Sequence, residues 1–391
     1  MRIAIIDADL IGKNNHRFPN LACMKISSYF KSKGDKVELK LDYNNLEEYD
    51  KVFISKVFTD TPVNEDILKM NNVIYGGTGF YYDKAPKLPC YIEHCMPDYD
   101  LYLDFVNTNI EQGAKRKDFE YYLDYSIGFT TRGCFRKCEF CVNKNYNKVE
   151  KHSPLSEFYN ENKKYICLLD DNILGYSGWR EVFEELIKTG KPFQYKQGMD
   201  ERVLTKEKCE VLAKCKYKGD FIFAFDNIND SQIIETKLKL LRQYIDKRCK
   251  FYVLCAFDRE GKWDNNFWRQ DIIDTFERIS ILTRYNCLPY VMRFKEYENS
   301  PYRGLYINLA SWCNQPAIFK KMTFREFCIK KGISSKVYKE YKDNPDKYLK
   351  DGYKKRSAWR YLDEFSKDNK DIVDMYFDLD FSQTSANESN I

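Results

Sequence analysis

Residues 125–141 read YSIGFTTRGCFRKCEFC and join a short apolar segment to three closely spaced cysteines. The first six residues, 125–130, have the length and apolar character of a buried strand. Cys134, Cys138 and Cys141 follow this segment with the spacing C-x3-C-x2-C. Thiolates are soft ligands, and three of them on one loop suit an iron–sulfur cluster. The sequence therefore predicts a metal-binding loop that directly follows a strand.

The chain around this loop alternates between strand and helix patterns. Six strands with intervening helices over about 200 residues indicate a partial (β/α)6 barrel of TIM type, whose ligands bind at the carboxyl ends of the strands. After 125–130, we expect strands at 165–169, 193–196, 221–225, 251–256 and 288–294, and helices at 178–189, 206–215, 230–244 and 270–285.

The first third of the chain shows a second, separate alternation. It predicts a Rossmann-like or flavodoxin-like domain, because short apolar strands alternate with helices. The expected strands are 2–7, 36–41, 51–58 and 73–75, and the expected helices are 21–33 and 63–70. The fold class is thus α/β. The predicted domains are residues 1–118, the barrel at 119–317, and a helical C-terminal extension at 318–391 with a frayed tail.

Composition excludes several classes of protein. With 43% hydrophobic and 16% aromatic residues among 391, the chain can form a sizeable core and is not disordered. No stretch approaches the ~18–20 apolar residues that cross a bilayer, so we expect no membrane association. We read the N-terminus as a buried strand, with no signal peptide. Fourteen cysteines without an export signal indicate reduced thiols or metal ligands in a cytoplasmic protein.

A basic segment lies near the C-terminus. Residues 320–360 hold fourteen Lys and Arg against five Asp and Glu, while the whole chain carries a net charge of +5. Such a segment can bind nucleic acid, or it can be the solvated face of helices. The sequence favours the solvated face, because the lysines are interspersed with acidic residues.

The cysteine loop resembles the signature of the radical S-adenosylmethionine (SAM) superfamily, C-x3-C-x-aromatic-C after the first strand of a partial barrel. The resemblance implies that Cys134, Cys138 and Cys141 bind a [4Fe–4S] cluster, and that Phe140 packs near the adenine of SAM. It also implies an activity: reductive cleavage of SAM to a 5′-deoxyadenosyl radical that activates a substrate C–H bond. An external electron donor, such as flavodoxin or ferredoxin, is implied as well.

Polar residues at the ends of later strands extend this resemblance. Asp170-Asp171-Asn172 stands where superfamily members place a motif that binds the SAM amino group. Residues 197–202, QGMDER, resemble a run in which Arg202 would hold a carboxylate and Asp200 would meet the ribose. The predicted cofactor-binding set also includes Gln197 and Asp226. Loop capping or helix N-capping is the alternative role for these residues.

The N-terminal domain resembles the cobalamin-binding domain that many superfamily members carry. Asp9 stands where the usual fingerprint has histidine, and Gly76-Gly77 forms a turn that could admit a nucleotide tail. The alternative is a scaffold or substrate platform without cobalamin. Overall the chain most resembles an uncharacterised subgroup of radical SAM proteins with such a domain.

Two functions from different classes follow. The first is a radical SAM enzyme, with cobalamin-dependent methyl transfer as one branch. Its substrate is a small molecule, a peptide or a nucleic acid, and no residue is assigned to its catalysis. The second is a non-enzymatic module that binds zinc on the cysteine loop and nucleic acid through the basic segment. A missing fourth ligand opposes the zinc site.

Overall fold

The computed structural model describes residues 1–13, 16–344 and 358–381. The chain divides into two compact units. Unit 1 contains residues 1–197 together with 215–219. Unit 2 contains residues 198–214 and the chain from 220 onward.

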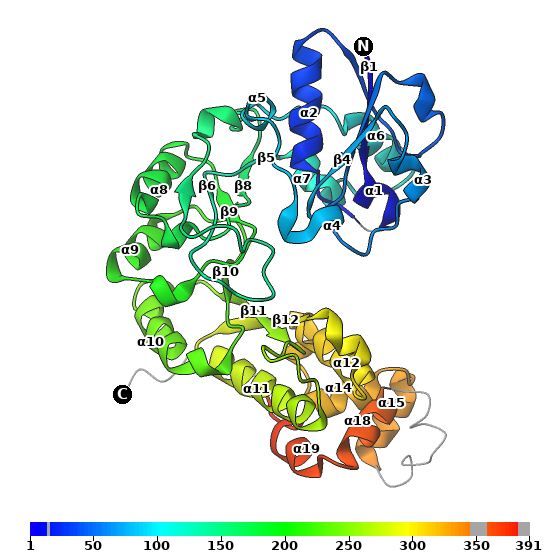
Figure 1. Cartoon of the computed structure of the whole chain (residues 1–391). Helices are drawn as coiled ribbons and strands as arrows, with labels where there is room; N and C mark the ends of the chain where they lie inside the picture. The colour runs from blue at the N-terminus through cyan, green and yellow to red at the C-terminus, as the bar shows by residue number, and fades with distance from the viewer. Residues whose placement is uncertain (14–15, 345–357, 382–391) are drawn as a thin grey trace. The chain divides into compact units, whose positions relative to one another are not determined.

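Unit 1 begins with a four-stranded parallel sheet of order β2-β1-β3-β4. This is the order of a flavodoxin-like sheet, in keeping with the predicted α/β class. Its strands β1 and β4 are labelled in the blue N-terminal part of the chain in Figure 1. The strands are β1 (Arg2–Asp7), β2 (Lys36–Leu39), β3 (Lys51–Ser55) and β4 (Val73–Gly76). The helices in this part are α1 (Ala8–Gly12), α2 (Leu21–Ser32), α3 (Glu65–Leu68), α4 (Thr78–Tyr81), α5 (Cys90–Glu93), α6 (Leu103–Glu111) and α7 (Glu120–Leu123).

Residues 3–6 of strand β1 are all apolar, because both faces of the strand are covered. Ile3 and Ile5 pack into a core with α2 and residues 92–122, whereas Ala4 and Ile6 pack into a second core with residues 46–54. All four side chains are fully buried. Continuous apolar runs of this kind are typical of parallel strands between two layers.

A second parallel sheet of unit 1 carries the cysteine loop. Its order is β5-β8-β9, from Tyr125–Gly128, Tyr165–Leu168 and Phe193–Tyr195. Helix α8 (Trp179–Lys188) lies between β8 and β9 in the chain. A two-stranded antiparallel ribbon, β6 (Thr131–Arg132) with β7 (Glu150–Lys151), follows β5.

Unit 2 contains a third parallel sheet, β10-β11-β12, and most of the helices. The strands are β10 (Phe221–Ala224), β11 (Cys249–Cys255) and β12 (Cys287–Arg293). The helices are α9 (Lys206–Lys214), α10 (Ser231–Arg242), α11 (Asn265–Arg284), α12 (Arg303–Cys313), α13 (Pro316–Phe319), α14 (Phe324–Lys330), α15 (Ser335–Asp343), α18 (Trp359–Ser366) and α19 (Lys370–Tyr376).

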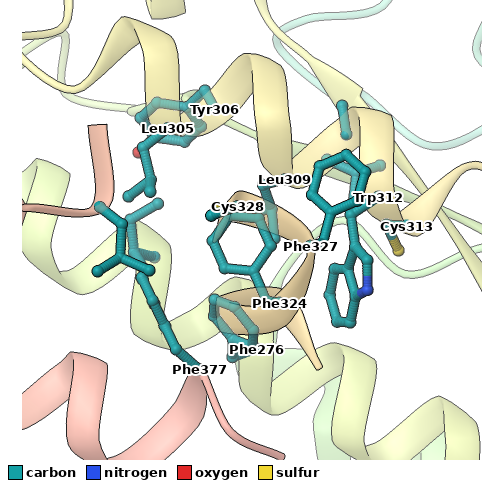
Figure 2. Close-up of a cluster of buried hydrophobic side chains, with 14 of the residues drawn as sticks. Phe276, Leu305, Tyr306, Leu309, Trp312, Cys313, Phe324, Phe327, Cys328 and Phe377 are labelled. Atoms are coloured by element: carbon teal, nitrogen blue, oxygen red, sulfur yellow. The ribbon is translucent and has the colours of Figure 1, made fainter. Parts of the chain in front are cut away.

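A large aromatic core joins the C-terminal helices to the sheet of unit 2. Figure 2 shows Phe276 of α11, Trp312 of α12, Phe324 of α14 and Phe377 around a common centre. All four are at most 1% exposed. Cys313 lies in the same core, with its Sγ atom 3.7 Å from a backbone oxygen of β12. The C-terminal helices are therefore an integral layer of unit 2.

The predicted strands and helices agree closely with the structure, and their ends differ by a few residues. The helix expected at 63–70 is shorter, because α3 spans only Glu65–Leu68. A partial barrel stays a prediction, since its six strands form two separate sheets in different units. The predicted domain boundaries also stay predictions. Part of the basic segment (345–357) and the tail (382–391) lie outside the described residues.

No helix among the described residues is long and apolar enough to cross a membrane.

Candidate functional site

The cysteine loop is closed at its base by the β6–β7 ribbon, which pairs Thr131 with Lys151. Gly133 follows β6 with a φ of +90°, a conformation that favours glycine. A Cβ atom at Gly133 would lie 2.6 Å from the carbonyl oxygen of Lys148 and 2.6 Å from the ring of Tyr146. The two sides of the loop thus approach each other so closely that only glycine fits directly ahead of the first cysteine.

Asp170 anchors the start of this loop from the end of β8. The residue is 2% exposed. Its carboxylate accepts hydrogen bonds from the backbone N–H of Thr130 (3.1 Å) and Thr131 (2.7 Å), and also from both hydroxyls. Burial raises the pKa of Asp170 to about 6, although these hydrogen bonds oppose the rise. The predicted contact of Asp170 with SAM stays a prediction.

Asp171 connects the two ends of the cysteine loop. Its Oδ2 atom accepts a hydrogen bond from the backbone N–H of Gly133 at 2.7 Å, and its Oδ1 atom accepts one from Nδ2 of Asn143 at 2.6 Å. These partners stand just before Cys134 and just after Cys141. Burial raises the pKa of Asp171. One carboxylate therefore fixes both ends of the cysteine segment.

N–H groups point at two of the sulfur atoms of the cysteine loop. The backbone N–H of Arg136 and Nδ2 of Asn172 both lie 3.3 Å from Sγ of Cys134, and the backbone N–H of Asn143 lies 3.4 Å from Sγ of Cys141. N–H donors around ligand sulfurs stabilise thiolate charge and tune the potential of iron–sulfur clusters. The donors suit sulfur atoms that carry negative charge.

The three cysteines are half-buried thiols on a single loop. Burial raises the pKa of Cys141, so its thiolate needs a cation or further donors beside it. Asn172 is 3% exposed, and its Oδ1 atom has no hydrogen-bond partner among the described residues. These features fit an iron–sulfur cluster with a ligand beside it. Across residues 1–13, 16–344 and 358–381, no three Cys, His, Asp or Glu side chains are grouped so that they could hold one single metal ion.

The N-terminal part of unit 1 contacts the same loop. Tyr82 donates a hydrogen bond from its hydroxyl to the carbonyl oxygen of Phe140 at 3.0 Å, and Asn145 donates from Nδ2 to the carbonyl oxygen of Asp83 at 2.6 Å. The Phe140 side chain is half-buried. The residues that follow α4 thereby help to position the loop, and the expected contact of Phe140 with adenine stays a prediction.

In unit 2, Arg202 joins two carboxylates. Its Nε atom lies 2.7 Å from Oδ1 of Asp200, and one terminal nitrogen lies 2.7 Å from Oδ2 of Asp230. Burial works against the charged guanidinium, but the two carboxylates raise the pKa of Arg202 overall. The expected pairing of Arg202 with a ligand carboxylate stays a prediction, and in the structure the chain supplies the carboxylates itself.

The other two predicted residues of the later strands have different environments. Asp226 follows β10, and its Oδ1 atom accepts a hydrogen bond from the backbone N–H of Leu254 at 3.2 Å. Burial raises the pKa of Asp226. Gln197 is exposed at the end of its segment in unit 1. The structure thus places Asp170, Asp171 and Asn172 at the cysteine loop. It places Asp200, Arg202 and Asp226 in unit 2.

Glu201 is a buried carboxyl group that sequence reasoning did not single out. It is 0% exposed, and neither carboxyl oxygen has a hydrogen-bond partner among the described residues. Burial raises its pKa well above the usual range, and Asp200 adds to the effect. The surroundings of Glu201 therefore favour its neutral form over its charged form.

Two residues at the carboxyl edge of the N-terminal sheet lie close to the loop that follows β3. Asp9 is fully buried and accepts hydrogen bonds from the backbone N–H groups of Val57 (2.6 Å) and Phe58 (3.4 Å). Gly77 has a φ of +106°, and a Cβ there would lie 2.3 Å from the carbonyl oxygen of Lys56. Asp9 thus anchors the loop after β3 and is not free to ligate cobalt.

The two glycines of the Gly-Gly turn differ in the space around them. A Cβ at Gly77 would contact the backbone, whereas a Cβ at Gly76 would meet no atom within 4 Å. A group the size of a methyl therefore has room at Gly76 and not at Gly77. Binding of a cofactor by Gly76 and Gly77 stays a prediction.

The structure adds residues to the site that the sequence reasoning missed. They share one property, because each fixes the backbone of the cysteine loop. The sequence offered one signal for them: a glycine stands directly before the first cysteine, where a sharp turn is needed. The added residues are Thr130, Thr131, Gly133, Asn143 and Tyr82.

Comparisons with known proteins give remote neighbours only. No protein-family profile matches the chain, and no curated protein matches it. A solved radical S-adenosylmethionine methyltransferase, TsrM from Kitasatospora setae with cobalamin and a [4Fe–4S] cluster bound, matches with 10% identity and a TM-score of 0.47. The match covers 75% of this chain and 72% of that chain.

A second structure of TsrM, with tryptophan substrate and the SAM analogue aza-SAM bound, matches with 12% identity and a TM-score of 0.47. It covers 74% of this chain and 72% of that chain. At this level of similarity, the two structures assign the chain neither a family nor an activity.

Proposed function

We propose that the protein is a radical SAM enzyme, with Cys134, Cys138 and Cys141 as the ligands of a [4Fe–4S] cluster. The observation that carries the proposal is the cysteine loop itself. It has the spacing C-x3-C-x2-C, Asp171 connects its two ends, and N–H donors lie 3.3–3.4 Å from two of its sulfur atoms. A loop of this kind suits a cluster with three protein ligands.

Bound there, the cluster would supply one electron for the cleavage of SAM to methionine and a 5′-deoxyadenosyl radical. The residues of the chain have separate tasks. Asp170 and Asp171 hold the loop backbone in place, and Asn172 donates to the sulfur of Cys134. The Oδ1 atom of Asn172 has no hydrogen-bond partner in the described part of the chain, so it is an acceptor for an N–H donor such as the amino group of SAM.

Within this proposal, the more specific activity is cobalamin-dependent methyl transfer. Asp9 occupies the position of the usual histidine, and its carboxylate is engaged by the loop after β3. Asp9 would therefore not serve as a cobalt ligand for a bound cobalamin. Addition of hydroxocobalamin, followed by gel filtration and absorbance spectroscopy, tests this branch independently of SAM cleavage.

The decisive experiment uses full-length protein that is purified and reconstituted without oxygen. Iron and acid-labile sulfide are quantified, SAM and dithionite are added, and 5′-deoxyadenosine is measured by mass spectrometry. About four irons per chain and 5′-deoxyadenosine formation are expected. Cys134→Ala, Cys138→Ala and Cys141→Ala should each abolish the product.

Cys313→Ala is the matched control, because Cys313 is a buried cysteine of unit 2 with no place on the loop. It should leave iron content and product formation unchanged. Stoichiometric zinc without 5′-deoxyadenosine would reject the proposal in favour of a structural metal site. Wild-type cleavage by all three loop variants would equally reject it.

A further inference from the structure

A second group of cysteines lies in unit 2, away from the cysteine loop in sequence. Cys249 and Cys287 begin the adjacent parallel strands β11 and β12, and they are register partners. Partners on neighbouring strands are about 4.8 Å apart, and disulfides span Cα distances of about 4.4–6.8 Å. Their side chains lie on the same face of the sheet, because register partners stand directly opposite each other and residues alternate between the faces in step on both strands. The Cα spacing typical of such register partners thus lies within the range of disulfides.

Arg242, the last residue of α10, contacts this pair directly. One terminal nitrogen of its guanidinium lies 3.2 Å from Sγ of Cys287. The other N–H groups donate to backbone carbonyl oxygens of residues 245, 247, 285 and 286, at 2.7–3.2 Å. Within the described part of the chain, Arg242 makes no ion pair with a carboxylate. The two thiols are therefore the groups beside Arg242 that can become anionic.

The electrostatics of the two thiols differ. A hydrogen bond from Cys287 and the charge of Arg242 lower the pKa of Cys249, although burial opposes this. Burial and the neighbouring Cys249 raise the pKa of Cys287 well above its usual range. Cys249 is thus the more acidic sulfur of the pair. By contrast, burial alone raises the pKa of Cys215.

The pair is buried but lies close to the surface. Both cysteines are 0% exposed, whereas residues 246–248, directly before Cys249, are exposed. Arg242, which covers the pair, is only half-buried. The exposed residues 246–248 therefore mark the side from which a small reagent would approach Cys249.

We propose that Cys249 and Cys287 form a reactive dithiol, activated by Arg242, that a small disulfide such as oxidised glutathione converts into a bridge between β11 and β12. The thiolate of Cys249 attacks one sulfur of the small disulfide, and the first small thiolate leaves. Cys287 then loses its proton and attacks Sγ of Cys249, so that the second small thiolate leaves. The two cysteines are oxidised by two electrons, and the small disulfide is reduced to two thiols.

The test uses the full chain, incubated without oxygen with excess oxidised glutathione, alkylated, and mapped by peptide mass spectrometry. We expect a crosslinked peptide pair containing Cys249 and Cys287, with two reduced glutathione molecules released per bridge. Cys313 is the internal reference, because it is equally buried and burial raises the pKa of its thiol. Cys249 should react at least about tenfold faster than Cys313.

Variants separate activation from simple proximity. Arg242→Gln should slow formation of the bridge, and Arg242→Lys should restore part of the rate because it keeps the positive charge. Cys287→Ser should stop the reaction at a mixed disulfide on Cys249. Cys313→Ser should change nothing. Circular dichroism confirms that each variant is folded.

Two results would overturn the proposal. The first is a wild-type protein in which Cys249 reacts no faster than Cys313. The second is a folded Arg242→Gln variant that forms the bridge at the wild-type rate. Since wild-type mapping decides the first result, the proposal stays testable even where a variant fails to fold. No readout depends on an iron–sulfur cluster or on SAM.

Discussion

The carboxylate of Asp171 accepts a hydrogen bond from the backbone N–H of Gly133 at 2.7 Å, across 38 residues of sequence. The same carboxylate accepts a second hydrogen bond from Asn143, at the other end of the cysteine segment. The geometry of the three cysteines therefore depends on a residue that lies outside their loop.

Replacement of Asp171 by Ala should loosen the cysteine loop and leave the rest of unit 1 folded. It leaves the buried N–H of Gly133 without a partner, which costs about 1–3 kcal/mol. It also removes the acceptor of the half-buried Asn143 amide. We expect iron incorporation to fall several-fold and the unfolding midpoint in urea to decrease. Asp171→Asn is the matched variant, because it keeps one acceptor oxygen and should lose less. Equal iron content in wild type and Asp171→Ala would contradict this role.

Replacement of Gly133 by Ala should disrupt the same loop by a different cause. A Cβ would clash with the Lys148 carbonyl oxygen in addition to adopting an unfavourable positive φ. Gly113→Ala is the control, because Gly113 has a φ of +96° but a Cβ there would meet nothing within 4 Å. Gly113→Ala should cost only about 1 kcal/mol, and Gly133→Ala should cost more and abolish cluster binding. Similar urea midpoints for the two variants would show that the close approach is unimportant.

Replacement of Asn172 by Ala should change the redox potential of a bound cluster. Nδ2 of Asn172 donates to Sγ of Cys134 at 3.3 Å, and such hydrogen bonds stabilise the added charge of a reduced cluster. Without this donor the midpoint potential should become more negative, and cleavage of SAM by a weak reductant should slow. A redox titration followed by electron paramagnetic resonance measures the shift. An unchanged potential in a fully loaded variant would refute the contact.

The stability of unit 1 should decrease as pH rises from about 4 to 7, because of Asp7. Burial raises the pKa of Asp7 from 3.8 to about 7 in the folded state. The folded chain therefore keeps a proton that the unfolded chain releases, and the contribution is complete below pH 4 and lost above pH 7. The slope from this group reaches about 1.4 kcal/mol per pH unit.

Asp7→Asn should remove this slope, since an amide does not titrate. The difference in unfolding free energy between the two proteins, measured in urea at several pH values, isolates Asp7 from other groups. Asp170 titrates in the same direction, because burial raises its pKa to about 6. Parallel pH curves for wild type and Asp7→Asn would contradict the buried, protonated state of Asp7.

Much of the secondary structure could be predicted because it follows from periodicity. The apolar run 2–7 became β1, and the strand before the cysteines became β5. Residues 170–172 follow β8 and contact the cysteine loop, and their contact with a cofactor stays a prediction. Their partners could not be predicted, because a carboxylate serves equally as a ligand contact or as a backbone acceptor. Burial decides between these roles, and burial depends on the fold.

In unit 2, too, the partners of a residue could not be predicted from the sequence. Arg202 reads as a binding residue, yet Asp200 and Asp230 surround its guanidinium. Asp230 lies 28 residues further on, and nothing in its local sequence indicates this pairing. Likewise, the register of β11 with β12 brings Cys249 and Cys287 together, and spacing alone does not predict that.

The chain leaves unit 1 after residue 197 and returns to it at residues 215–219, which affects synthesis and truncation of the protein. Unit 1 includes residues 215–219, where Tyr217 pairs with Phe193 of β9 and its hydroxyl accepts from the backbone N–H of Tyr195. During synthesis, the sheet next to the cysteines cannot be completed until this short return segment leaves the ribosome. A fragment that stops at residue 197 would lack it, so any genetic dissection of the molecule should keep residues 1–219 together.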